Sequence, residues 1–105
     1  MSSLRKRKRY VFYKIENHRL AIHEVKDRLD DLYRYLYGEV ERASTLLKMF
    51  RRNNNLVICV DKNKLFRALS LITLLKIGLN LRIKYRFVSS TYKEGLRKLS
   101  NLTNM

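Results

Sequence analysis

The order in which the hydrophobic periodicity changes along this chain is its strongest constraint on the fold. In some segments apolar residues alternate with a period of two, which is typical of strands, and in others they recur every three or four residues, which is typical of helices. Strands are predicted at residues 9–16, 45–52, 56–60 and 79–88, and helices at 20–37, 62–77 and 91–102. The order β-α-β-β-α-β predicts an α+β fold of the RRM-like or ferredoxin-like type. In this fold two helices cover one face of a four-stranded antiparallel sheet, and here a C-terminal helix follows.

The predicted strand 79–88 alternates most regularly. Its odd-numbered positions, from Leu79 to Phe87, are apolar, and Arg82, Lys84 and Arg86 stand between them. Because successive side chains of a strand point to opposite faces, the odd positions are expected in the core. The three cations are then expected in a row on the outer face, about 7 Å apart. The row is predicted to bind a polyanion, and the strand to lie at an edge of the sheet.

The outer face of the sheet is predicted to combine aromatic, apolar and cationic side chains. The first three strands contribute Tyr10, Phe12, Lys14, Leu46, Lys48, Phe50, Val57 and Cys59. Such a face suits base stacking and phosphate binding, but no segment has the RNP1 pattern of an RRM. The alternative is an apolar patch that the C-terminal helix or a partner protein covers. The candidate partner contacts are Phe12, Leu46, Phe50, Val57 and Cys59.

Turn and capping residues predict where the helices begin and end. Gly38 and Gly78 are expected to end the two long helices, and Asp61 or Asn63 to cap the second. The asparagines at 53–55 are expected to form a hairpin turn. The first helix should bury one apolar stripe, made by Ile22, Val25, Leu29, Leu32 and Leu36. The second helix is apolar around much of its circumference and is expected to be deeply packed.

The charge of the chain points to an anionic partner. Its 24 Lys and Arg residues against 9 Asp and Glu give a formal net charge of +15. Repulsion among these positive charges destabilises the folded chain unless a polyanion neutralises them. Nucleic acid is the commonest such partner, and an anionic membrane surface is the next. A charged surface of the thermophilic kind would instead match Lys with Glu. Residues 1–8 are predicted to form a basic, phosphate-binding tail before a single domain over residues 9–105.

The sequence contains no apparent catalytic or metal-binding set. Cys59 is the only cysteine, which excludes an intrachain disulfide and a cysteine-based zinc site, and His18 and His23 do not complete a ligand pattern. Neither a glycine-rich phosphate loop nor a nucleophile motif occurs. No apolar run is long enough to span a bilayer. A cytoplasmic protein that binds no cofactor of its own and no membrane is therefore expected.

Three segments resemble protein component 2 of archaeal ribonuclease P, one of the eukaryotic and archaeal ribonuclease P protein subunits. They are KRYVFYKI at 8–15, LVICVDKN at 56–63 with FRALSLI at 66–72, and VSSTYK at 88–93. They occur in the family's order and the resemblance covers about residues 6–100. The chain differs at Ser90, where the family has Gly, at Glu94 and Gly95, which interrupt the last helix, and in its basic, Asn-rich turn between the second and third strands.

The resemblance implies a role in tRNA processing. In that ribonucleoprotein endonuclease, the RNA subunit uses Mg²⁺ to hydrolyse the 5′ leader from precursor tRNA. The protein component stabilises the RNA and itself carries no catalytic residues. The implied partners are ribonuclease P RNA, a TIM-barrel-like protein subunit of the same enzyme, and a second copy of the chain within a heterotetramer. Precursor tRNA is the substrate of the complex.

The predicted RNA contacts are cations of the tail, the outer sheet face and the C-terminal helix. They are Arg5, Lys6, Arg7, Lys8, Arg9, Lys14, Lys48, Arg82, Lys84, Arg86 and Lys93. Two other functions stay open: a general RNA- or DNA-binding protein, such as a ribosomal or chromatin component, and an assembly module whose open sheet face dimerises. A complex with the TIM-barrel-like subunit that forms without RNA would distinguish the first hypothesis from both.

Overall fold

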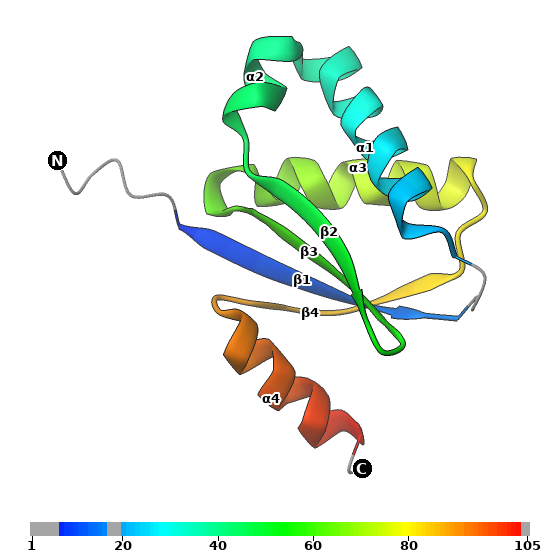
Figure 1. Cartoon of the computed structure of the whole chain (residues 1–105), viewed down its shortest axis with the longest axis vertical. Coiled ribbons are helices and arrows are strands. Elements are labelled where there is room, and N and C mark those ends of the chain that lie inside the picture. Colours follow the sequence, from blue (N-terminus) through cyan, green and yellow to red (C-terminus); the bar gives the residue numbers. More distant parts are fainter. Residues whose placement is uncertain (1–6, 17–19, 104–105) are drawn as a thin grey trace, which may run out of the picture.

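A computed structural model, which describes residues 7–16 and 20–103, confirms the predicted α+β arrangement (Figure 1). The strands are β1 (Lys8–Ile15), β2 (Leu47–Arg52), β3 (Asn55–Asp61) and β4 (Ile83–Ser89). The helices are α1 (Ile22–Tyr37), α2 (Glu39–Ser44), the short 3-10 helix η2 (Lys62–Lys64), α3 (Leu65–Gly78) and α4 (Tyr92–Thr103). The strands pair antiparallel in the order β2-β3-β1-β4, so β4 lies at an edge as predicted.

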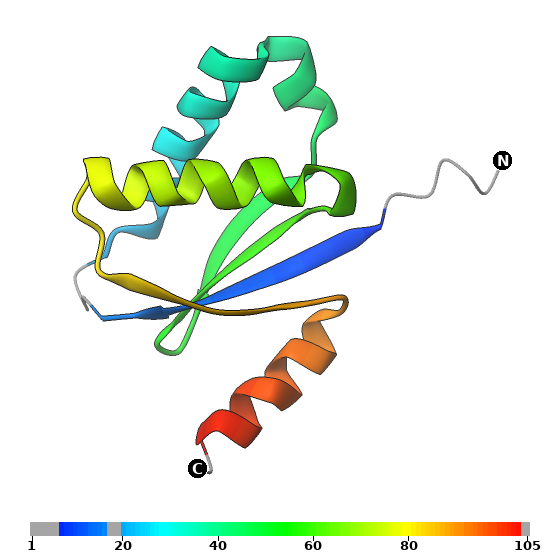
Figure 2. The same cartoon turned by 180° about the vertical axis from the view of Figure 1, so that it is seen from behind.

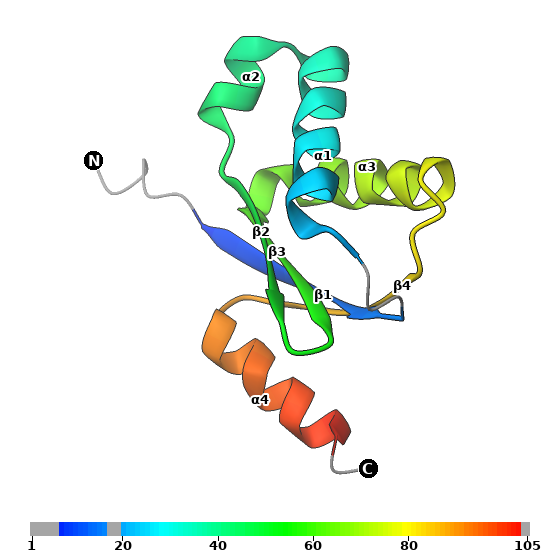
Figure 3. The same ribbon diagram turned by 45° about the vertical axis from the view of Figure 1, so that its right-hand side comes forward.

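The sheet separates two layers of helix. Figures 1 and 2 show α1 and α3 on one side of the sheet and α4 on the other. The main core lies between the sheet and the pair α1 and α3, which Figure 3 shows crossing each other. The core side chains of β1 are Val11, Tyr13 and Ile15, as the alternation predicted. Burial of the apolar faces of these elements is what stabilises the fold.

The apolar stripe of α1 is confirmed except at its C-terminal end. Leu36 is 48% exposed, whereas Tyr33 is fully buried in its place. The Tyr33 hydroxyl lies 3.2 Å from Oγ1 of Thr45 and donates to Oε1 of Glu41 at 3.3 Å. A phenol can be buried here because its polar tip has partners. Sequence periodicity could not show this, since those partners follow the helix in the chain.

The prediction that α3 is packed around its circumference is wrong for one side of the helix. Ala68, Leu71 and Ile72 are buried against the core. Phe66 and Ile77, by contrast, are 82% and 76% exposed. The helix has the sheet and α1 on its inner side, so residues on its outward side have nothing of this domain to pack against.

Several predicted boundaries also move. The short helix α2 was not predicted, because six residues are too few to reveal a helical period, and β2 consequently begins at Leu47 rather than at 45. Gly38 does separate α1 from α2: its φ is +93°, and its N–H donates to the carbonyl of Arg34 at 2.8 Å. Asp61 does not cap a helix; its carboxylate accepts the N–H of Leu46 at 2.9 Å. Asn63 lies within η2, and α3 has no side-chain cap.

The last strand departs most from its predicted pattern. It begins at Ile83, and the preceding residues 79–82 form a connection. Phe12 pairs with Phe87 but Tyr13 pairs with Tyr85, so Arg86 is the extra residue of a β-bulge. The bulge reverses the alternation: Phe87 turns to the α4 side, and Val88 packs against the main core.

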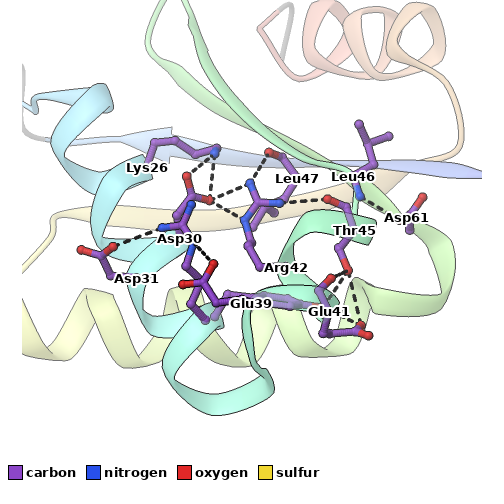
Figure 4. Close-up of polar contacts among 12 residues, drawn as sticks. Lys26, Asp30, Asp31, Glu39, Glu41, Arg42, Thr45, Leu46, Leu47 and Asp61 are labelled. Carbon is purple, nitrogen blue, oxygen red and sulfur yellow. Dashed lines mark hydrogen bonds and ion pairs between the residues drawn. The ribbon is translucent and has the colours of Figure 1, made fainter.

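A polar network holds the α1–α2–β2 connection in place (Figure 4). The Arg42 guanidinium bonds to Oδ1 of Asp30 through Nε at 2.9 Å and Nη2 at 2.8 Å. It also donates to the carbonyl oxygen of Thr45 at 2.9 Å. Lys26 pairs with the same Asp30 carboxylate at 2.7 Å. Nearby, the pKa of the Glu41 carboxyl is lowered, mainly because Lys64 donates a hydrogen bond to it.

Replacing Arg42 with lysine is expected to lower the free energy of unfolding by about 1 kcal/mol, because one ammonium cannot reach both Asp30 and the backbone in the geometry of the guanidinium fork. Urea denaturation measures the change. Arg34→Lys is the matched control, since its ion pair with Asp31 is exposed, and it is expected to change stability by less than about 0.5 kcal/mol. Equal losses for both variants would contradict a structural role for Arg42.

Candidate nucleic-acid interface

The face of the sheet on the α4 side consists of three cross-strand rows. The first row is Lys48, Cys59, Tyr10 and Ser89; the second is Phe50, Val57, Phe12 and Phe87. The third is Arg52, Asn55, Lys14 and Lys84. The face is therefore apolar at its centre and cationic toward the β2–β3 turn.

The aromatic centre of this face is covered by α4. Tyr92 contacts three sheet aromatics, with ring centroids 5.8 Å from Tyr10, 6.4 Å from Phe12 and 5.5 Å from Phe50. The rings of Phe12 and Phe87 stack at 4.9 Å. Burial is the main cause that raises the pKa of the Tyr10 hydroxyl. These rings pack within the chain, so they do not form the open base-stacking surface that was one alternative.

The partner contacts predicted on this face are mostly interior. Phe12 and Val57 are fully buried and Cys59 is 4% exposed. The prediction that these three side chains contact a partner protein is therefore wrong in this structure, because the chain covers them itself. Phe50 is half-buried against Tyr92, and Leu46 is a half-buried residue ahead of β2.

Gly95 allows α4 to lie this close to the sheet. A Cβ atom at this position would overlap Cε1 and Cζ of the Phe12 ring. By contrast, a Cβ atom at Gly78 would meet nothing within 4 Å. The glycine that interrupts the sequence pattern of the last helix thus lies where the helix backbone closely approaches the Phe12 ring.

The start of α4 is capped by its own sequence. The Thr91 hydroxyl accepts the N–H of Glu94 at 3.1 Å, and the Ser90 hydroxyl donates to the Glu94 carboxylate at 3.2 Å. Ser89 is buried and donates to the carbonyl oxygen of Thr91 at 2.6 Å. Ser90 has no positive φ, so a serine fits here without backbone strain.

The third row, with the bulge residue Arg86, is named here the cation row: Arg52, Asn55, Lys14, Lys84 and Arg86. The four paired residues, one on each strand, span about 14 Å across the sheet, because neighbouring strands lie about 4.8 Å apart. Lys14, Arg52 and Lys84 are exposed, and Arg86 is half-buried. None of the ion pairs among residues 7–16 and 20–103 involves these cations. Unneutralised cations held this close favour an anionic ligand.

A cleft of about 440 Å³ opens beside the cation row and is named here the α4 cleft. Its lining residues are Lys14, Arg52, Asn53, Asn54, Asn55, Arg86, Leu96, Leu99 and Ser100. Three are cationic and none is acidic. Asn53 has φ +54°, which forms the turn that brings the asparagines to the rim. Nε of Arg86 and Oδ1 of Asn55 are buried and have no hydrogen-bond partner among the described residues.

The structure brings together only some of the predicted RNA-binding cations. Lys14, Lys84 and Arg86 meet in the cation row. The others are distributed elsewhere: Arg82 precedes β4, Lys48 lies across the aromatic centre, Lys93 lies on α4, Lys8 opens β1, Arg7 precedes it, and Arg9 falls on the helix side of the sheet. Arg5 and Lys6 lie outside the described residues, as does His18. Because Lys8 pairs with Asp61, β1 begins within the predicted tail.

Sequence reasoning missed Arg52 and the contribution of α4 to the site. Arg52 pairs with Asn55, which pairs with Lys14 on the next strand. The two-residue turn at Asn53 and Asn54 was a usable signal, since a hairpin of this length sets the register of its strands. Leu96 and Leu99 could not be assigned to the site before the position of α4 was known.

Charge is unevenly distributed over the molecule. The helices α1 and α2 contain six of the nine acidic residues and only four of the 24 Lys and Arg residues. Figure 1 shows α4 on the side of the sheet opposite α1 and α2, and the strand register places the cation row on this α4 side. A polyanion is therefore attracted to the α4 side more strongly than to the α1–α2 side.

No protein-family model matches this sequence, and no curated protein is significantly similar to it. Within the described residues, the structure contains no helix that is both long enough and apolar enough to cross a membrane.

Proposed function

We propose that this chain is an RNA-binding subunit that neutralises phosphates of a structured RNA. The cation row carries this proposal, because it presents cations from three strands on one face of the sheet, and none of them forms an ion pair within the described part of the chain. Lys and Arg contacts to phosphate dominate nucleic-acid affinity. The covered aromatic centre favours phosphate contacts over base stacking on the sheet.

We further propose that the RNA belongs to ribonuclease P. The support is the resemblance of three ordered segments to that enzyme's protein subunits, together with a strongly basic composition. In this role the chain supports a catalytic RNA that removes the 5′ leader of precursor tRNA with Mg²⁺. Phosphate neutralisation by the protein would lower the Mg²⁺ concentration that the RNA needs to fold and react.

The protein partner is proposed to dock on the helix side of the molecule. The sheet residues first considered for this contact are interior, whereas Tyr35, Phe66 and Ile77 are 85%, 82% and 76% exposed on α1 and α3. Aromatic side chains are enriched in protein interfaces relative to the rest of the protein surface. RNA on the α4 side and protein on the helix side would let one small chain join both.

Reconstitution tests this function. The chain is expected to increase precursor-tRNA cleavage by archaeal ribonuclease P RNA at low Mg²⁺ in the presence of the TIM-barrel-like subunit, and to bind that subunit without RNA. Binding is measured by size-exclusion chromatography, and cleavage by the yield of leader-free tRNA. Equal affinity for unrelated RNA and DNA, with no protein complex and no gain in cleavage, would instead support the general nucleic-acid-binding alternative.

A further inference from the structure

The α4 cleft combines three kinds of surface that a bare phosphate would not use together. Its cationic side is formed by Lys14, Arg52 and Arg86. Asn53, Asn54 and Asn55 of the β2–β3 turn also line the cleft, and Leu96 and Leu99 of α4 form an apolar wall. Phosphate binding alone accounts for the cations but leaves the amides and the apolar wall without a role.

We propose that the α4 cleft holds one unstacked nucleotide of the bound RNA, an inference that rests on the proposed RNA-binding function. The phosphate pairs with Lys14, Arg52 and Arg86. The base lies against the apolar wall of α4, and its polar edge faces the amides of the turn. Single-stranded loops and bulges supply such bases, because their bases can leave the stack and expose their hydrogen-bonding edges.

The size and the electrostatics of the cleft agree with this ligand. Its volume of about 440 Å³ lies within the range of clefts that bind small ligands, about 300–1,000 Å³. Arg86 is half-buried, and its Nε finds no hydrogen-bond partner in residues 7–16 and 20–103. A partly desolvated cation interacts strongly with a phosphate that reaches its remaining N–H groups.

A bulged RNA hairpin tests the inference against the same hairpin fully paired. The bulge should bind the wild-type chain about tenfold more tightly in fluorescence anisotropy at fixed salt, the gain expected from one additional set of base contacts. Ser100→Phe places a ring at the lining of the cleft without changing charge, and Ser100 is exposed, so the fold should tolerate it. This variant should lose the bulge preference, because its ring takes up space in the cleft that the base would occupy.

Asn101→Phe is the matched control. Asn101 is the next exposed residue of α4 and does not line the cleft, so the preference for the bulge should remain. A wild-type chain that binds both hairpins equally, with the usual salt dependence, would overturn the nucleotide site while leaving phosphate binding intact. Retention of the bulge preference by Ser100→Phe would overturn it too. Failure to bind either hairpin would instead contradict the proposed function.

Discussion

Gly95→Ala is expected to destabilise the protein by about 2 kcal/mol, although alanine is the better helix former. A Cβ atom here overlaps the Phe12 ring, and overpacking of a tight contact costs about 1–3 kcal/mol. Alanine favours the helix over glycine by about 1 kcal/mol. This gain offsets part of the cost of the clash, so the clash itself costs more than the net loss of stability. Urea denaturation measures the total, and hydrogen exchange of the α4 amides shows whether the helix separates from the sheet first.

Gly78→Ala and Phe12→Leu are the controls for this contact. Gly78 is also helical and has open space at its Cβ, so its substitution should be neutral or stabilising by up to about 1 kcal/mol. Phe12→Leu removes the ring atoms that the new Cβ would strike, so Gly95→Ala should cost less in that background. If both glycine substitutions had the same effect on stability, α4 could not pack on Phe12 as described.

The second large effect is expected from removing three cations of the α4 cleft together. The triple substitution Lys14→Gln, Arg52→Gln and Arg86→Gln should weaken RNA binding about 100-fold near physiological salt. It should also reduce the slope of log affinity against log salt by about 2–3, because each lost phosphate contact removes about 0.7–0.9. Fluorescence anisotropy over a salt series measures both quantities.

A triple variant on the helix side separates position from total charge. Arg28, Arg51 and Lys76 are exposed on α1, the helix side of β2, and α3. Changing all three to Gln also lowers the formal net charge from +15 to +12. Arg51 and Arg52 are neighbours on one strand that face opposite sides, so the comparison is close. If the two triple variants bound RNA equally weakly, net charge alone would explain the affinity.

Much of the fold followed from local pattern. The core side chains of β1 and the hairpin at the asparagines both depend on residues close together in the sequence. The β4 bulge did not follow, because an extra residue at Arg86 is defined only by the pairing of β4 with β1. The same bulge turns Phe87 from its predicted core position to the α4 side.

The candidate site was predicted only in part for a related reason. The cations Lys14, Lys84 and Arg86 were identified from strand alternation alone. Their association with Arg52 depends on register across all four strands, and the α4 cleft depends on where the last helix packs. The Gly95 contact shows most clearly what the sequence could not predict. Within the helix pattern this glycine is only unfavourable, and the reason for it is the Phe12 ring, which is more than 80 residues away in the chain.

By itself the sequence determined the order of the four strands and the three long helices and the excess of positive charge, because both arise from residue types and their local spacing. Only the tertiary structure decided which face α4 covers and which cations lie together. Backbone pairing and side-chain packing bring residues 14, 52 and 86 into one cleft, and no local pattern records distances between segments so far apart in the chain.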